Sequence, residues 1–188
     1  MNPVGRALAR WHLGPNAITA IGVALQAVAA YLIVEGRLLA AGLVMIVAAF
    51  ADAIDGAVAK AAGMATKFGA LLDSTSDRLS DGLYFISVAW LYGVSPDAAQ
   101  VDERWVAALA LTALVVSYLV SYIKARAEGL GYDCNVGIME RAERLILMIA
   151  GLIFSSVLPI VLGVLTVLSF VTVVQRLVYV RRQVKSAV

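Results

Sequence analysis

Four aspartates in the apolar first half of the chain have the types and spacing of a metal site. Asp52, Asp55, Asp73 and Asp77 all fall within a stretch that is otherwise rich in Ala, Leu, Val and Ile. A carboxylate at the centre of a membrane helix costs roughly 2.5–3.5 kcal/mol on insertion scales. Four such groups would also repel one another unless divalent cations neutralise them. We therefore expect them to bind metal.

The spacing of these residues places them on two helix faces. One set is spaced i, i+3, i+4, i+7 and the other i, i+4, i+8, so each forms a single stripe. The sets are Asp52, Asp55, Gly56 and Ala59, and Gly69, Asp73 and Asp77. The small residues would allow the two helices to approach closely. Oxygen ligands without nearby histidine or cysteine suit magnesium, manganese or calcium rather than zinc.

The composition of the chain predicts that lipid is its solvent. Of 188 residues, 62% are apolar and only 15% are charged, which is more apolar surface than a soluble domain of this size can bury. The net charge of +2 gives no indication of a nucleic-acid partner. The single cysteine, Cys134, excludes an internal disulfide.

Apolar runs near the ~20 residues needed to cross a bilayer predict six transmembrane helices in an all-α integral membrane protein. Their expected ranges are 16–34, 38–60, 69–91, 105–126, 140–157 and 159–179. We expect one domain over 1–188, with a juxtamembrane interfacial amphipathic helix in 1–14, the six-helix bundle in 15–182 and a tail in 183–188. A cleaved signal peptide is the alternative for the first segment, but a full-length span follows it.

The basic residues predict the orientation of these spans. If six spans alternate, all Lys and Arg residues except Arg37 and Arg104 fall on one side. The positive-inside rule then places both termini and the aspartates toward the cytoplasm. The expected location is the cell membrane, as a multi-pass protein whose active site faces the cytoplasm.

The aspartate region resembles the signature of the CDP-alcohol phosphotransferase family, D-x2-D-G-x2-A-R-x8-G-x3-D-x3-D. Seven of its eight fixed positions match between Asp52 and Asp77. The exception is Lys60, where the family has arginine; lysine keeps the charge but loses the bidentate fork. The resemblance extends over the chain, since six spans and a Gly-Pro-Asn-x-x-Thr entry to the first helix also fit the family.

The resemblance implies transfer of a phosphatidyl-type group from a CDP-linked lipid to an alcohol, with release of CMP. Two Mg²⁺ ions, or Mn²⁺, would be held by the four aspartates, and Asp77 would also be the general base. It further implies a homodimer. The residues implied to bind the CDP-lipid are Asn16, Ala17, Ile18, Thr19, Gly56, Lys60, Thr66 and Gly69.

A basic cluster in the second half predicts a phosphorylated acceptor. Its members lie at the end of the fourth span, the start of the fifth and the end of the sixth: Lys124, Arg126, Arg141, Arg144 and Arg176. Such a cluster suits a phosphate monoester, although basic side chains at helix ends also snorkel toward lipid headgroups. These segments are similar to phosphatidylinositol phosphate synthases and archaetidylinositol phosphate synthases. Inositol 1-phosphate is thus the expected acceptor and CDP-diacylglycerol the expected donor.

Other functions remain open on the sequence alone. Within the same chemistry, glycerol phosphate is the next candidate acceptor, as in phosphatidylglycerol phosphate synthase, and a free alcohol such as serine or inositol is third. From another class, an ion or proton-coupled transporter would also use intramembrane carboxylates. The halves of the chain are unlike, however, and nothing in them resembles an inverted repeat.

Overall fold

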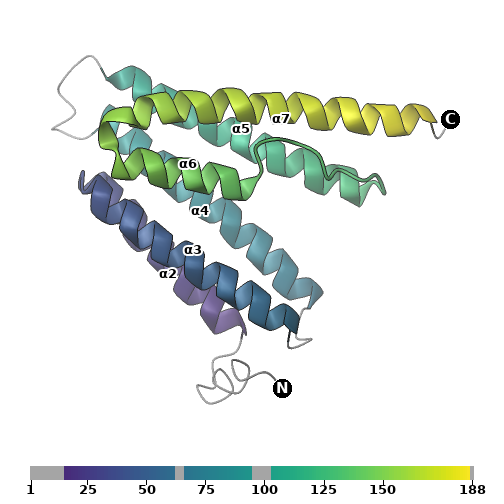
Figure 1. Cartoon of the computed structure of the whole chain (residues 1–188), viewed down its shortest axis with the longest axis horizontal. Helices are drawn as coiled ribbons and strands as arrows, with labels where there is room; N and C mark the ends of the chain where they lie inside the picture. Colours follow the sequence, from purple (N-terminus) through teal and green to yellow (C-terminus); the bar gives the residue numbers. More distant parts are fainter. Residues whose placement is uncertain (1–14, 62–65, 95–102, 187–188) are drawn as a thin grey trace.

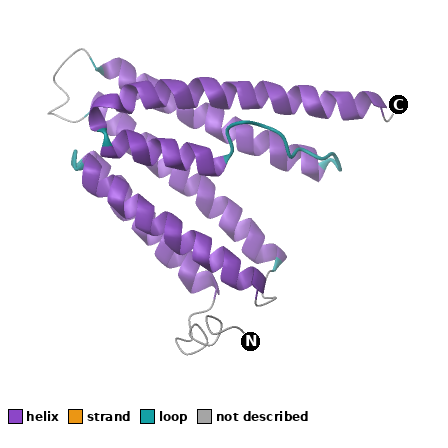
Figure 2. Ribbon diagram, viewed as in Figure 1, coloured by secondary structure: helices purple, strands orange, loops and turns teal. Residues whose placement is uncertain are grey.

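The structure, a computed structural model, describes residues 15–61, 66–94 and 103–186, without the side chains of 15–19, 53–61 and 186. Within these ranges the chain forms six α-helices, a short 3-10 turn and no strand (Figure 2). The elements are α2 Pro15–Val34, α3 Leu38–Ala61, α4 Lys67–Gly93, α5 Arg104–Gly129, α6 Arg141–Ile153, η2 Ser155–Val157 and α7 Leu158–Ser186. The all-α prediction is confirmed; the amphipathic helix predicted in 1–14 lies outside the described residues.

Helices that follow one another along the chain run in opposite directions. The contacts between the helices form a closed ring. The ends of α2, α4 and α6 gather with the starts of α3, α5 and α7 at the left of Figure 1, and the opposite ends splay apart. The main contacts join α2 to α3, α3 to α6, α6 to α7, α7 to α5, α5 to α4 and α4 back to α2. The bundle is therefore tight at one end and open at the other.

The tight end holds the apolar core. Residues from all six described helices are fully or almost fully buried together there, among them Ile33, Met45, Val88, Leu152 and Leu162. The turn between α2 and α3 depends on Gly36, whose φ of 71° lies in the left-handed region that favours glycine. Packing at this end fixes the helix directions. The polar residues of α3, α4 and α6 therefore meet nearer the open end of the bundle.

Large apolar side chains also cover the outside of the bundle. Exposed examples occur on every helix, such as Tyr31, Phe50, Trp90, Ile146 and Phe170. A monomeric soluble protein rarely exposes apolar surface so continuously. In the described part of the chain, two helices are both long and apolar enough to cross a membrane, Arg104–Gly129 and Ser155–Lys185.

The fifth predicted span differs from the structure. We expected a helix over 140–157, but α6 has only 13 residues and ends at Ile153. At 1.5 Å per residue it is about 20 Å long, shorter than a ~30 Å hydrocarbon layer. The chain leaves the helix at Phe154 and passes through the 3-10 turn before Pro159 enters the first turn of α7, where proline is tolerated. The helix thus does not cross such a layer by itself.

Candidate active site

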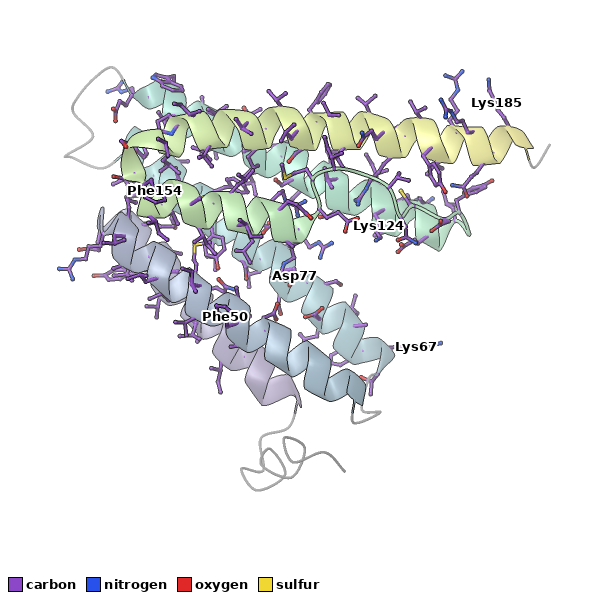
Figure 3. All side chains as sticks on the ribbon, viewed as in Figure 1. Phe50, Lys67, Asp77, Lys124, Phe154 and Lys185 are labelled. Carbon is purple, nitrogen blue, oxygen red and sulfur yellow. The ribbon has the colours of Figure 1, made fainter. Side chains whose placement is uncertain are left out.

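Three of the four predicted metal ligands meet at the open end of the bundle. Oxygens of Asp52 on α3 and of Asp73 and Asp77 on α4 all lie within 4.8 Å of one another. Asp77 is 9% exposed, whereas Asp73 is exposed to solvent. Figure 3 shows Asp77 on α4, close to the start of α6. The side chain of Asp55 lies outside the described residues, although α3 continues through its position.

The sequence of α4 explains how so polar a helix enters the bundle. Thr66 caps its first turn, with its hydroxyl oxygen accepting a hydrogen bond from the Gly69 N–H at 2.9 Å. The hydroxyls of Ser74, Thr75 and Ser80 each donate to a carbonyl oxygen three or four residues earlier. These polar groups are satisfied within the helix, so its carboxylates remain free to interact with other elements.

Arg141, the first residue of α6, bridges two of these carboxylates. Its Nη2 lies 2.7 Å from Asp77 Oδ1 and its Nη1 lies 3.0 Å from Asp52 Oδ2. Arg78 approaches Asp77 from the other side at 3.5 Å and is 38% exposed. One guanidinium thus joins α6 to both α3 and α4. The sequence analysis assigned Arg141 to the acceptor phosphate and did not predict this contact.

In the structure Arg144 is buried between α6 and α4. It is 4% exposed, and its Nη2 lies 3.1 Å from Asp81 Oδ2 on α4. Its Nη1 also donates to the Met139 carbonyl at 3.5 Å. A buried guanidinium with these partners braces α6 against α4. The assignment of Arg144 to the acceptor phosphate stays a prediction. Its one-turn spacing from Arg141 made the two look alike in sequence.

Arg176 on α7 is likewise buried, at 3% exposure. Its Nε donates to the Val136 carbonyl at 2.8 Å, its Nη1 to the Val120 carbonyl at 2.6 Å, and its Nη2 to Glu140 at 3.4 Å. These bonds hold the α5–α6 loop against α7 and so position the start of α6. A phosphate at Arg176 would have to replace the Glu140 contact, which is the longest of the three.

The two remaining members of the basic cluster are more accessible. Lys124 is 34% exposed at its side chain and pairs with Glu128 at 4.0 Å, and Arg126 is exposed. Within the described residues neither of them shares an ion-pair partner with Arg141, which pairs with Asp52 and Asp77. The cluster predicted from the sequence is therefore divided into two buried braces, two accessible cations and Arg141 at the carboxylates.

The predicted CDP-lipid residues are only partly described. Thr66 and Gly69 form the start of α4, on the same helix as Asp73 and Asp77. The side chains of the others lie outside the described residues: Asn16, Ala17, Ile18, Thr19, Gly56 and Lys60. Their assignment stays a prediction.

Tyr84 was not predicted from the sequence. It lies on α4 three residues after Asp81 and seven after Asp77, so the three share a face. The side chain is 2% exposed, and its hydroxyl has no hydrogen-bond partner among the described residues. Extending the i, i+4, i+8 stripe by two turns, to i+12 at Asp81 and i+15 at Tyr84, with aromatic residues included, would have found it.

A family model for CDP-alcohol phosphatidyltransferases matches residues 12–178, which is most of the chain and includes the carboxylate site. The chain belongs to this family. It is a transferase of phospholipid biosynthesis, as the family resemblance predicted.

Relatives of this phosphatidyltransferase include a phosphatidylinositol phosphate synthase and an archaetidylinositol phosphate synthase. It is 39% identical to the phosphatidylinositol phosphate synthase of Mycobacteroides abscessus, over 96% of this chain and 83% of that one. It is 36% identical to the archaetidylinositol phosphate synthase of Pyrococcus horikoshii, over 97% and 91%.

Solved structures agree with these relatives. The fold is similar to that of Mycobacterium tuberculosis phosphatidylinositol phosphate synthase with CDP-DAG bound, at a TM-score of 0.86 and 36% identity over 95% and 92% of the two chains. A second structure of that synthase, in complex with manganese and citrate, gives a TM-score of 0.85 at 36% identity over 95% and 87%.

Proposed function

We propose that this phosphatidyltransferase transfers the phosphatidyl group of CDP-diacylglycerol to a hydroxyl of inositol 1-phosphate, giving phosphatidylinositol phosphate and CMP. The observation that carries the proposal is the meeting of Asp52, Asp73 and Asp77 beside Arg141, in a chain 36–40% identical to phosphatidylinositol phosphate synthases. One site then holds carboxylates that can bind cations and a guanidinium that can bind a phosphate.

The donor set fits divalent cations. Three carboxylate side chains with oxygens this close suit hard ions that prefer oxygen, and a fourth carboxylate, Asp55, follows one turn after Asp52. We propose two Mg²⁺ ions, or Mn²⁺, held by Asp52, Asp55, Asp73 and Asp77. Bound there, they would supply charge neutralisation for the pyrophosphate and for the departing CMP.

The protein residues then have defined tasks. Asp77 accepts the proton of the acceptor hydroxyl as the hydroxyl oxygen bonds to the phosphatidyl phosphorus. The bond from that phosphorus to the bridging oxygen breaks, and its electron pair leaves with CMP. Asp77 itself is buried, next to the partly exposed Arg141.

Accessible cations are proposed to receive the acceptor phosphate. Arg141 adjoins the carboxylates. On the last turns of α5, Lys124 is partly exposed and Arg126 is exposed. We propose that these three bind the phosphate, with Arg176 holding the loop that leads to α6. The CDP part is assigned to the start of α4 and to the residues named from the family signature.

The setting is proposed to be the cell membrane, with the carboxylate site and both termini toward the cytoplasm. The apolar outer surface of all six helices supports lipid as the solvent, since the exposed side chains are those that water disfavours. The distribution of basic residues supports the orientation. A homodimer is proposed from the family resemblance.

The acceptor can be tested with purified protein in detergent, CDP-diacylglycerol, Mg²⁺ and separate radiolabelled acceptors. Inositol 1-phosphate is expected to give labelled lipid, while glycerol phosphate, serine and free inositol give little. Preferential labelling by glycerol phosphate would reassign the enzyme within its family. The same assay with a CDP-archaeol donor tests the ether-lipid alternative suggested by the Pyrococcus relative.

A further inference from the structure

The Arg141 guanidinium occupies the space between carboxylates that the proposed cations would use. It contacts Asp77 at 2.7 Å and Asp52 at 3.0 Å, and these residues come from three different helices. Both partner carboxylates belong to the group whose oxygens lie within 4.8 Å of one another. The contact is therefore with carboxylates that are proposed to bind metal and not with a peripheral acid.

A guanidinium and a divalent cation would compete for these carboxylates. Each guanidinium nitrogen that donates to a carboxylate oxygen uses part of the acceptor capacity of that oxygen. A divalent ion bound by the same carboxylates would also repel the adjacent positive charge. Binding of the divalent cation and the Arg141 contact are thus in competition.

Arg141 can leave this position without moving α6. Its side chain is 30% exposed, whereas Arg144, one turn later, is buried against Asp81. Met148 and Leu152 further anchor the helix in the core. The backbone of α6 is therefore fixed, and a rotamer change at Arg141 carries its charge toward solvent at the first turn of the helix. That turn has no side-chain cap at Glu140, so its N–H groups add to the attraction for an anion.

We propose that Arg141 is a binding residue that exchanges between two partners, the carboxylates of Asp52 and Asp77 and the phosphate of the acceptor. Loading of the divalent cation releases the guanidinium, which then binds the phosphate monoester. This inference rests on the proposed function, because it takes the acceptor to be phosphorylated. Linkage requires the reciprocal effect: the phosphate monoester must tighten binding of the divalent cation.

A simpler role for Arg141, a brace that holds the carboxylates in place, predicts the opposite response. Removing a brace would loosen the arrangement of Asp52 and Asp77 and weaken cation binding. Removing a competitor would strengthen it. The affinity for the cation itself, measured without turnover, distinguishes the two roles.

The test measures Mn²⁺ binding by electron paramagnetic resonance on the purified full chain in detergent, for wild type, Arg141→Gln and Arg141→Lys. Arg181→Gln, an exposed charge near the far end of α7, is the matched control. We expect Arg141→Gln to bind Mn²⁺ at least about 5-fold more tightly than wild type, a typical coupling factor. Arg141→Lys should fall between them, and Arg181→Gln should match wild type. Equal or weaker binding by Arg141→Gln overturns the proposal; if that variant does not fold, binding by Arg141→Lys that is no tighter than wild type overturns it.

A second arm adds inositol 1-phosphate, with a protein-free titration to subtract direct complexation of Mn²⁺. Wild type should bind Mn²⁺ about 5-fold or more tightly in its presence, and Arg141→Gln should show no such change. Coupling that persists in Arg141→Gln would assign it to another residue and contradict the proposal. If coupling occurs as expected but inositol 1-phosphate is not converted to lipid, the proposed acceptor is wrong while the exchange at Arg141 stands.

Discussion

Arg144 and Asp81 form a buried ion pair, with 3.1 Å between Nη2 and Oδ2 and side chains that are 4% and 11% exposed. The pair lies one turn beyond the contact of Arg141 with Asp77, so α6 is attached to α4 at two successive levels. The Arg144–Asp81 contact is shielded from solvent, whereas Arg141 in the other contact is partly exposed. From this difference we expect Arg144 to contribute mainly to stability and Arg141 mainly to binding.

Arg144→Ala should destabilise the protein by about 3–5 kcal/mol, because it leaves the Asp81 carboxylate buried without its partner. Thermal unfolding in detergent would measure the loss as a lower Tm. The double variant Arg144→Met/Asp81→Leu, which removes both charges, should recover most of it. A variant Arg144→Ala with unchanged Tm and a raised KM for inositol 1-phosphate would return Arg144 to the acceptor site.

The contact of α4 with α5 depends on Gly82. The Tyr118 hydroxyl donates to the Arg78 carbonyl at 2.7 Å, and a Cβ added at Gly82 would lie 2.6 Å from that hydroxyl oxygen. Gly82→Ala should therefore cost about 1–3 kcal/mol through overpacking next to the carboxylate site.

Two further variants control this prediction. Tyr118→Phe in the Gly82→Ala background should restore part of the stability, since it removes the clashing atom, and a double-mutant cycle would measure the coupling. Gly22→Ala on α2 meets no atom within 4 Å and should be neutral or stabilising. Equal losses of Tm for Gly82→Ala and Gly22→Ala would refute the steric explanation.

The helices and the carboxylate site could be predicted because both depend on local periodicity. Apolar runs of about 20 residues indicated six helices, and i, i+4 spacing indicated that Asp73 and Asp77 share a face. The early end of α6 was missed, since Phe154, Val157 and Leu158 extend the apolar run on both sides of two serines, and the first proline comes only at Pro159.

The roles of the basic residues could not be separated from the sequence. Arg141, Arg144 and Arg176 carry the same charge near the ends of predicted spans, yet one contacts the carboxylates of Asp52 and Asp77 and two are buried braces. Burial depends on which carbonyls and carboxylates distant segments supply, such as Val120 and Val136 for Arg176. Such partners lie 40 or more residues away, where spacing has no predictive value.

The central claim is that the carboxylate site on α3 and α4 performs phosphatidyl transfer to inositol 1-phosphate. Its most direct test quantifies CMP and phosphatidylinositol phosphate by mass spectrometry for wild type and Asp77→Asn, with Glu35→Gln, an exposed acid at the other end of the bundle, as the control. Wild type and Glu35→Gln should form both products in equal amounts. Asp77→Asn should be slower by about 100-fold or more, the usual effect of losing a general base, while still binding CDP-diacylglycerol. Wild-type rates in Asp77→Asn, or CMP formed without the lipid product, would contradict the account.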